Sequence, residues 1–363
     1  MGVPLFATRP VLEPLLAEVA ARQEAVLRSG RYILGPEVEG FETEFAEYLG
    51  VRHCVGVANG TEALTIALRA LGVGPGDEVV VPALTFYATA EAVVNAGARP
   101  VFCDVDEATF TMTAATAEPA IGARTKALVP VHLYGNPAPM DELRSLAGAH
   151  GLRVLEDSAQ AAGAKLGGKA AGALGDAATF SFFPSKNLGG FGDGGAITTD
   201  DDDVAAAARQ LRFHGSGGGD VHTEVGYNSR LDELQAAGLR VLLPHLPAWT
   251  EARRAVAAAY AASSLAESLR LPVETAAGEC CYHLYVIRSP QRDRVAARLE
   301  AAEIGARAYY STPLHRQPAM REFAPSQPLA NVDAAAAESL ALPMGPALTA
   351  ADVEQVAAAL ASS

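Results

Sequence analysis

The chain has 363 residues, half of them apolar, which is enough for one large domain and a smaller one beside it. Its formal net charge is −14, from 28 basic and 42 acidic residues, and this charge disfavours nucleic acid and anionic membranes as partners. No apolar run reaches the roughly 18 residues of a membrane span. The N-terminus also lacks the basic start and apolar stretch of a signal peptide, so we expect a cytoplasmic protein.

Short apolar stretches alternate with helical stretches between about residue 55 and residue 245. This alternation predicts an α/β fold, in which helices cover both faces of a mostly parallel sheet. The clearest strands are residues 79–82, 99–104, 127–131 and 153–157, and the clearest helices are residues 62–70 and 140–149.

The C-terminal third has a different pattern. Residues 234–262 are rich in Ala, Leu and Arg and predict a long helical connector, and strands and helices alternate after about residue 270. We therefore expect a large domain at residues 1–245, with the N-terminal arm included, and a smaller α+β domain at residues 246–363.

The four cysteines show no Cys-x-x-Cys spacing, which indicates reduced thiols. Cys280, Cys281 and His283 are close in sequence and would suit a metal ion. However, residues 280–287 predict a strand whose side chains pack in a core, so we expect no metal site.

The segment 58–64 ends a predicted strand in a glycine turn and begins a helix at Thr61. Free N–H groups and the helix dipole favour an anion at such a position, and the Thr61 hydroxyl adds a donor. A phosphate site at Gly60 and Thr61 is one interpretation. An ordinary helix N-cap is the other, and this segment alone does not separate the two.

Asp157 closes an apolar strand, so its carboxylate should lie at the carboxyl edge of the sheet, where ligands bind in open α/β folds. A buried carboxylate needs a cationic partner, and the protonated pyridine nitrogen of pyridoxal phosphate (PLP) would serve. Gln160 could then reach the ring hydroxyl. The alternative is that Asp157 or Ser158 only caps a helix.

Lys186 follows an aromatic strand and precedes a run of glycines, within the segment 179–195. Its apolar neighbours, among them Phe182 and Leu188, should desolvate it. Desolvation lowers the pKa of a lysine and leaves a nucleophilic amine, which imine formation with an aldehyde requires. The glycines let the backbone approach a planar cofactor closely. The segment therefore indicates the Schiff-base lysine of a PLP enzyme.

Together with a polar loop around Asn228, these segments resemble the DegT family of sugar aminotransferases, within the aspartate-aminotransferase-like fold type I of PLP enzymes. The resemblance extends from about residue 35 to residue 344. It implies that Lys186 forms the internal aldimine with PLP, that Asp157 pairs with the pyridine nitrogen and that Gln160 contacts the ring oxygen.

The resemblance also implies how the cofactor phosphate is bound. Gly60, Thr61 and Ser181 would bind it from one chain, and Asn228 would reach it from the other subunit of a homodimer with shared active sites.

Aromatic and substrate contacts follow from the same resemblance. Phe86 would stack on the cofactor ring, although the adjacent Tyr87 offers a second candidate ring. Tyr310 and His315 resemble residues near the substrate in that family.

The expected reaction is also an implication of the resemblance. L-glutamate would give up its amino group with Lys186 as general acid and base, and the amine would pass to a nucleotide-linked keto-sugar in a ping-pong cycle. Residues 183–189 and 228–232 favour a 3-keto over a 4-keto sugar. Two alternatives rank lower: related dehydratases have His at the lysine position, and a cofactor-sensing regulator would need a basic DNA-binding module that this chain does not show.

Overall fold

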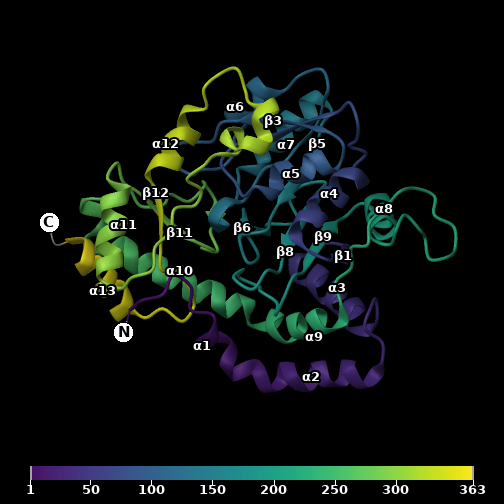
Figure 1. The fold of residues 1–363 in the computed structure, drawn as a ribbon, viewed down its shortest axis with the longest axis horizontal. Coiled ribbons are helices and arrows are strands. Elements are labelled where there is room, and N and C mark those ends of the chain that lie inside the picture. Colours follow the sequence, from purple (N-terminus) through teal and green to yellow (C-terminus); the bar gives the residue numbers. More distant parts are fainter. Residues whose placement is uncertain (1, 362–363) are drawn as a thin grey trace.

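A seven-stranded sheet forms the centre of the computed structural model, which describes residues 2–361 (Figure 1). In spatial order its strands are β1 (His53–Val57), β9 (Gly195–Thr199), β8 (Ala177–Ser181), β5 (Arg153–Asp157), β4 (Thr125–Leu128), β2 (Glu78–Pro82) and β3 (Arg99–Cys103). The pairs from β8 to β3 are all parallel, and β9 lies antiparallel between β8 and β1. The prediction of a mostly parallel α/β sheet is confirmed.

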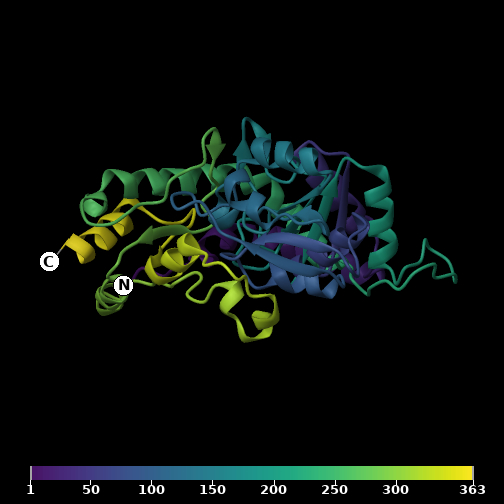
Figure 2. The same ribbon diagram turned by 90° about the horizontal axis from the view of Figure 1, so that it is seen from above.

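Helices cover both faces of this sheet: α4 (Gly60–Ala70), α5 (Ala88–Asn95) and α8 (Asp202–Arg212) on one face, and α3 (Pro36–Leu49) and α7 (Met140–His150) on the other (Figure 2). Alternating side chains of a strand point to opposite faces. Val79 and Val81 of β2 accordingly pack with α4 and α5, whereas Val80 packs with α7. Strands with both faces buried are apolar throughout, and this explains why they were evident in the sequence.

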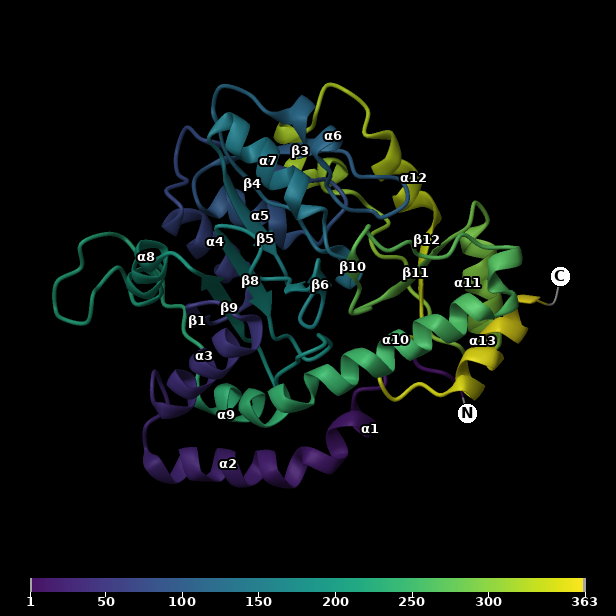
Figure 3. The ribbon, with the colours of Figure 1, turned by 180° about the vertical axis from the view of Figure 1, so that it is seen from behind.

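The helical connector predicted at residues 234–262 is confirmed. It consists of α9 (Glu233–Leu242), a 3-10 turn (Leu243–His245) and α10 (Leu246–Ala262), which follow one another along the edge of the molecule (Figure 3). α2 (Leu16–Ser29) packs along α9. The connector joins the large sheet to the C-terminal unit.

The C-terminal unit is a two-stranded antiparallel sheet packed against helices. Its elements are β11 (Tyr285–Arg288), β12 (Ser339–Leu342), α11 (Arg292–Ala301) and α13 (Ala350–Ala361), with α10 beside them. Val3 of the N-terminal arm joins this core through a parallel bridge to Ile304, whereas Leu314 and Val332 pack into the core of the large sheet. A domain division at residue 245 stays a prediction.

The remaining α-helices and strands of the described residues are short. They are α1 (Arg9–Leu12), α6 (Ala114–Ala117), α12 (Ala330–Glu338), and the three strands of a small second sheet, β10 (Gly278–Glu279), β6 (Lys165–Leu166) and β7 (Lys169–Ala170).

The strand predicted at residues 280–287 is wrong in its first half, because β11 begins only at Tyr285. Tyr282 has a left-handed backbone with φ of 46°, and the Cys281 N–H donates to the Gly135 carbonyl at 3.0 Å. The segment between Cys280 and β11 is therefore bound to the 3-10 turn Leu133–Gly135 and not to a neighbouring strand.

None of the helices in residues 2–361 is long and apolar enough to cross a membrane. The four cysteines are buried free thiols, and the described part of the chain contains no group of three or more His, Cys, Asp or Glu arranged for a metal ion.

Candidate active site

Lys186 lies in a tight turn that follows β8 at the carboxyl edge of the sheet. Its N–H donates to the Phe183 carbonyl at 2.8 Å, and the buried side chains of Phe182 and Leu188 anchor the turn on both sides. A Cβ on Gly189 would come within 2.6 Å of the Pro184 carbonyl oxygen, so the turn requires a glycine there. The turn places Lys186 in the wall of a cavity of about 880 Å³.

Asp157, the last residue of β5, lines the same cavity and is buried. Thr89 Oγ1 donates to one carboxylate oxygen at 2.8 Å, and the Ala159 N–H donates to the other at 3.2 Å. Thr85 in turn lies 3.1 Å from Thr89, hydroxyl to hydroxyl. These contacts fix the carboxylate and leave part of its hydrogen-bonding capacity for a cation.

The charges of Asp157 and Lys186 influence each other across the cavity. Burial raises the pKa of Asp157, and this rise is opposed first by the Thr89 hydrogen bond and also by the Lys186 charge. Burial lowers the pKa of Lys186 to about 8, and the Asp157 carboxylate opposes that change. With such a pKa roughly one lysine in ten is neutral at pH 7, compared with about one in three thousand for an ordinary lysine.

The N-terminus of α4 forms another part of the cavity wall. The Asn59 side chain accepts from the Glu62 N–H at 2.9 Å, and the N–H groups of Gly60 and Thr61 belong to the first turn, which has no intrahelical acceptors. A Cβ on Gly60 would lie 2.8 Å from Ser181 Cβ, so only glycine lets the end of β8 approach the helix this closely. Gly60, Thr61 and Ser181 all line the cavity.

Phe86, Gln160 and Tyr310 line the cavity as well. Phe86 is 56% exposed and its ring centroid lies 6.0 Å from that of Tyr310, whereas Tyr87 packs against the core. Gln160 donates to the Tyr310 hydroxyl at 3.0 Å and accepts from the Tyr134 N–H at 2.7 Å, so its amide is held in one orientation. Of the two candidate rings, Phe86 is the one that faces the cavity.

Two candidate residues from the sequence are not brought to the cavity by this chain. Asn228 is exposed and accepts a hydrogen bond from the Arg230 guanidinium. His315 points toward Asp333, with 3.5 Å between Nε2 and a carboxylate oxygen, and does not belong to the cavity lining.

His283 belongs to the cavity wall and was missed by the sequence analysis, which placed it in a packed strand. Its ring is buried, stacks on Phe6 at 6.4 Å and has a pKa held well below the usual value by burial, with a further contribution from the Lys186 and Arg253 charges. The left-handed turn at Tyr282 directs it there, and apolar periodicity carries no signal for such a turn.

These residues fit PLP. The cavity offers a partly neutral amine for the aldehyde, a buried carboxylate for a protonated ring nitrogen, and a helix N-terminus with Ser181 for the phosphate.

Comparison with known proteins gives the same class. The chain matches the DegT/DnrJ/EryC1/StrS aminotransferase family over residues 15–361. The dTDP-3-amino-3,4,6-trideoxy-alpha-D-glucose transaminase of Streptomyces venezuelae is 46% identical over 349 residues, which cover 95% of this chain and 92% of that protein. A pleiotropic regulatory protein of Geobacillus stearothermophilus is 45% identical over 352 residues, or 96% of this chain and 95% of that one.

Solved structures agree in fold. S. venezuelae DesV, crystallised with a ketimine intermediate, has a TM-score of 0.96 and 45% identity, covering 99% of this chain and 97% of that chain. NtdA from Bacillus subtilis with bound cofactor PMP has a TM-score of 0.91 and 31% identity, and the match covers 99% of this chain and 84% of that chain. Fold and cavity together define a PLP-dependent aminotransferase of fold type I. The chain belongs to the DegT/DnrJ/EryC1/StrS aminotransferase family.

Proposed function

We propose that this protein transfers the amino group of L-glutamate to a keto-sugar linked to a nucleoside diphosphate, by a ping-pong mechanism, and that it prefers a 3-keto to a 4-keto sugar. The observation that carries the proposal is that Lys186 and Asp157 line one cavity and influence each other's pKa in opposite directions. PLP supplies an electron sink for the bond broken at the amino-bearing carbon.

The roles of the two residues follow from their surroundings. The Lys186 amine, once displaced from the cofactor, would take the proton from the donor's α-carbon as general base and give it back as general acid. Asp157, fixed by Thr89 and the Ala159 N–H, would pair with the ring nitrogen and keep it protonated. Gln160 and Phe86 would orient the ring from its hydroxyl and its face, and Tyr310 would contact the substrate.

The acceptor is proposed from the relatives and from the cavity size. The name of the S. venezuelae relative places the transferred amino group on carbon 3 of a nucleotide-linked sugar. A cavity of about 880 Å³ lies in the range of small-molecule sites, up to roughly 1,000 Å³.

We also propose that the working unit is a homodimer with shared active sites, in which Asn228 completes the phosphate site of its partner. Asn228 is exposed and outside the cavity of its own chain, and Val221 and Val225 of the preceding loop are 72% and 83% exposed. Burial of such apolar residues would favour association with a second copy.

A panel of 3-keto and 4-keto nucleotide sugars tests the proposal. With glutamate and the PLP-loaded protein, we expect 2-oxoglutarate to form in step with an amino sugar, and NMR of the product to show nitrogen on carbon 3. No release of 2-oxoglutarate with any sugar would refute glutamate as the donor, and an amino group on carbon 4 would refute the preference.

A further inference from the structure

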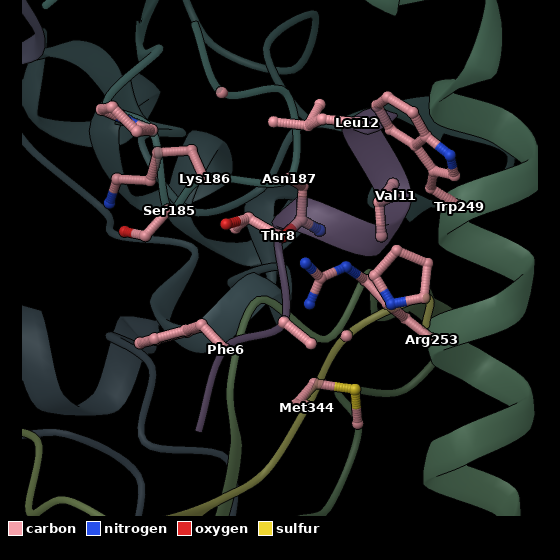
Figure 4. A pocket seen from close by; sticks show the side chains of 15 residues that line it. Phe6, Thr8, Val11, Leu12, Ser185, Lys186, Asn187, Trp249, Arg253 and Met344 are labelled. Carbon is pink, nitrogen blue, oxygen red and sulfur yellow. The ribbon is translucent and has the colours of Figure 1, made fainter. Parts of the chain in front are cut away.

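A small pocket of about 40 Å³ lies directly beside the cavity, behind the Lys186 turn (Figure 4). It is enclosed by the N-terminal arm, by residues 184–189, by α10 and by the segment 344–346. Phe6, Ser185 and Lys186 line both the pocket and the large cavity, so the two adjoin at the proposed reaction site. The pocket is too small for a sugar or a nucleotide and has the size of a single carboxylate group or one to two waters.

Arg253 projects into this pocket from α10 (Figure 4). It is only 7% exposed, and Nη1 donates to the Tyr282 carbonyl at 3.0 Å. Its Nε is buried without an acceptor, and no carboxylate of residues 2–361 forms an ion pair with it within 4.0 Å. A buried charge without a counter-charge is unfavourable unless a ligand supplies one.

The other two buried arginines of the described residues both form ion pairs with carboxylates. Arg212 is 8% exposed and pairs with Glu42, and Arg288 is 7% exposed and pairs with Glu107 and Glu338. Arg253 is as buried as either of them but has only a backbone carbonyl as acceptor. Burial lowers its pKa to about 10, so it is still a cation at neutral pH.

The pocket wall holds one further buried polar atom without a partner, on Asn187, and the wall of the adjoining cavity holds another, on His283. Asn187 donates through Nδ2 to the Cys281 carbonyl at 3.0 Å, and its Oδ1 has no donor. His283 Nδ1 is likewise unpaired, and the charges of both Lys186 and Arg253 act on this ring, which places His283 near both of them. Asn187 Oδ1 only accepts hydrogen bonds, so the group of this pocket that can pair with an anion is the Arg253 guanidinium, whose Nε–H has no acceptor.

We propose that Arg253 binds a carboxylate of the amino-acid donor, so that this carboxylate occupies the pocket while the donor's amino group lies at Lys186 in the adjoining cavity. The proposal rests on the proposed function, and it adds the residue that recognises the donor. A guanidinium matches a carboxylate with two parallel N–H bonds, and arginine is preferred over lysine where this geometry is needed.

Binding of glutarate to the PLP-loaded enzyme tests the proposal without turnover, because glutarate has both carboxylates of glutamate and no amine. By calorimetry we expect Arg253→Gln to weaken glutarate binding at least tenfold and Arg253→Lys to weaken it less. Arg254→Gln is the matched control: Arg254 is the next residue on α10 and pairs with Glu279 at 3.0 Å, and glutarate binding should not change.

Donor kinetics then identify which carboxylate is bound. In the half-reaction, Arg253→Gln should raise KM for glutamate at least tenfold with a smaller change in kcat. If KM also rises for L-norvaline but not for 4-aminobutyrate, Arg253 binds the α-carboxylate; the reverse pattern assigns the distal carboxylate. Either pattern supports the proposal.

Unchanged glutarate affinity and unchanged donor KM in a folded Arg253→Gln protein would overturn it. If that variant does not fold, Arg253→Lys with wild-type constants for both ligands would overturn it equally. Failure of the wild-type enzyme to react with glutamate is a separate result, because it refutes the proposed donor while the glutarate measurement still decides the role of Arg253.

Discussion

Two groups of opposite charge, Lys186 and Asp157, share one cavity, and each makes the charged state of the other less costly. Burial alone would favour a neutral lysine and a protonated carboxyl group, and their mutual attraction counteracts both changes. The result is a lysine whose pKa of about 8 is close to neutral pH. It lies beside a carboxylate that is fixed by donors from a threonine and the backbone.

The lowered pKa of Lys186 predicts how PLP capture depends on pH. Since only the neutral amine attacks the aldehyde, the capture rate of the apoprotein should rise with pH through a midpoint near 8. Asp157→Asn should move the midpoint to lower pH, because the carboxylate is the group that raises this pKa. Stopped-flow absorbance between pH 6 and 10, corrected with Nα-acetyl-lysine for the titration of PLP itself, measures the midpoint. A capture rate that still rises tenfold per pH unit up to pH 10, as expected for the ordinary lysine value of 10.5, would contradict the prediction.

Asp157→Asn should also impair chemistry with the fold retained. An amide cannot keep the pyridine nitrogen protonated, so the glutamate half-reaction should slow by roughly 10² or more, the effect of losing one electrostatic stabiliser. Rapid-mixing spectra measure the rate, and circular dichroism checks the fold. A half-reaction rate near that of the wild type would remove Asp157 from this role.

At the scale of elements, the proposed phosphate site depends on how closely the N-terminus of α4 approaches the end of β8. The approach is set by Gly60, since any side chain there would meet Ser181. The helix contributes its free N–H groups and the strand contributes a hydroxyl, so neither element forms the site alone.

Gly60→Ala should therefore weaken PLP binding, because the added methyl group forces α4 and β8 apart. We expect the dissociation constant of PLP, measured by fluorescence titration, to rise at least tenfold. Gly148→Ala in α7 is the control: its Cβ would meet nothing within 4 Å, and the change should stabilise the helix by about 0.5–1 kcal/mol without an effect on PLP. Equal PLP affinity in the two variants would show that the close approach is not needed.

At the scale of the whole molecule, the loop between α8 and α9 extends away from the body of the chain and leads to Asn228 (Figure 1). The proposed homodimer is supported by the exposed valines of this loop and by the fact that Asn228 does not line the cavity of its own chain.

Subunit mixing tests whether the active sites are shared. A Lys186→Ala protein and an Asn228→Ala protein, mixed in equal amounts and allowed to exchange, should form heterodimers with one intact site each. Random exchange would restore roughly a quarter of the wild-type sites in the glutamate half-reaction, with each variant alone much lower. Confirmed exchange with no recovery would mean that each site is built from a single chain.

The sequence by itself determined the fold class and the cofactor, because both depend on local patterns. Buried parallel strands are apolar along their whole length and are therefore evident in the sequence. The aromatic residues and glycines around Lys186, and the position of Asp157 at the end of a strand, indicate a PLP site from local sequence alone. Tertiary structure decided the contacts between distant segments. Phe86 faces the cavity, whereas Tyr87 packs against the core. His283 reaches the cavity wall through a left-handed turn, and Arg253, one of two adjacent arginines of α10, lies behind the Lys186 turn. Such positions depend on how elements far apart in the sequence pack together, and no local periodicity records that packing.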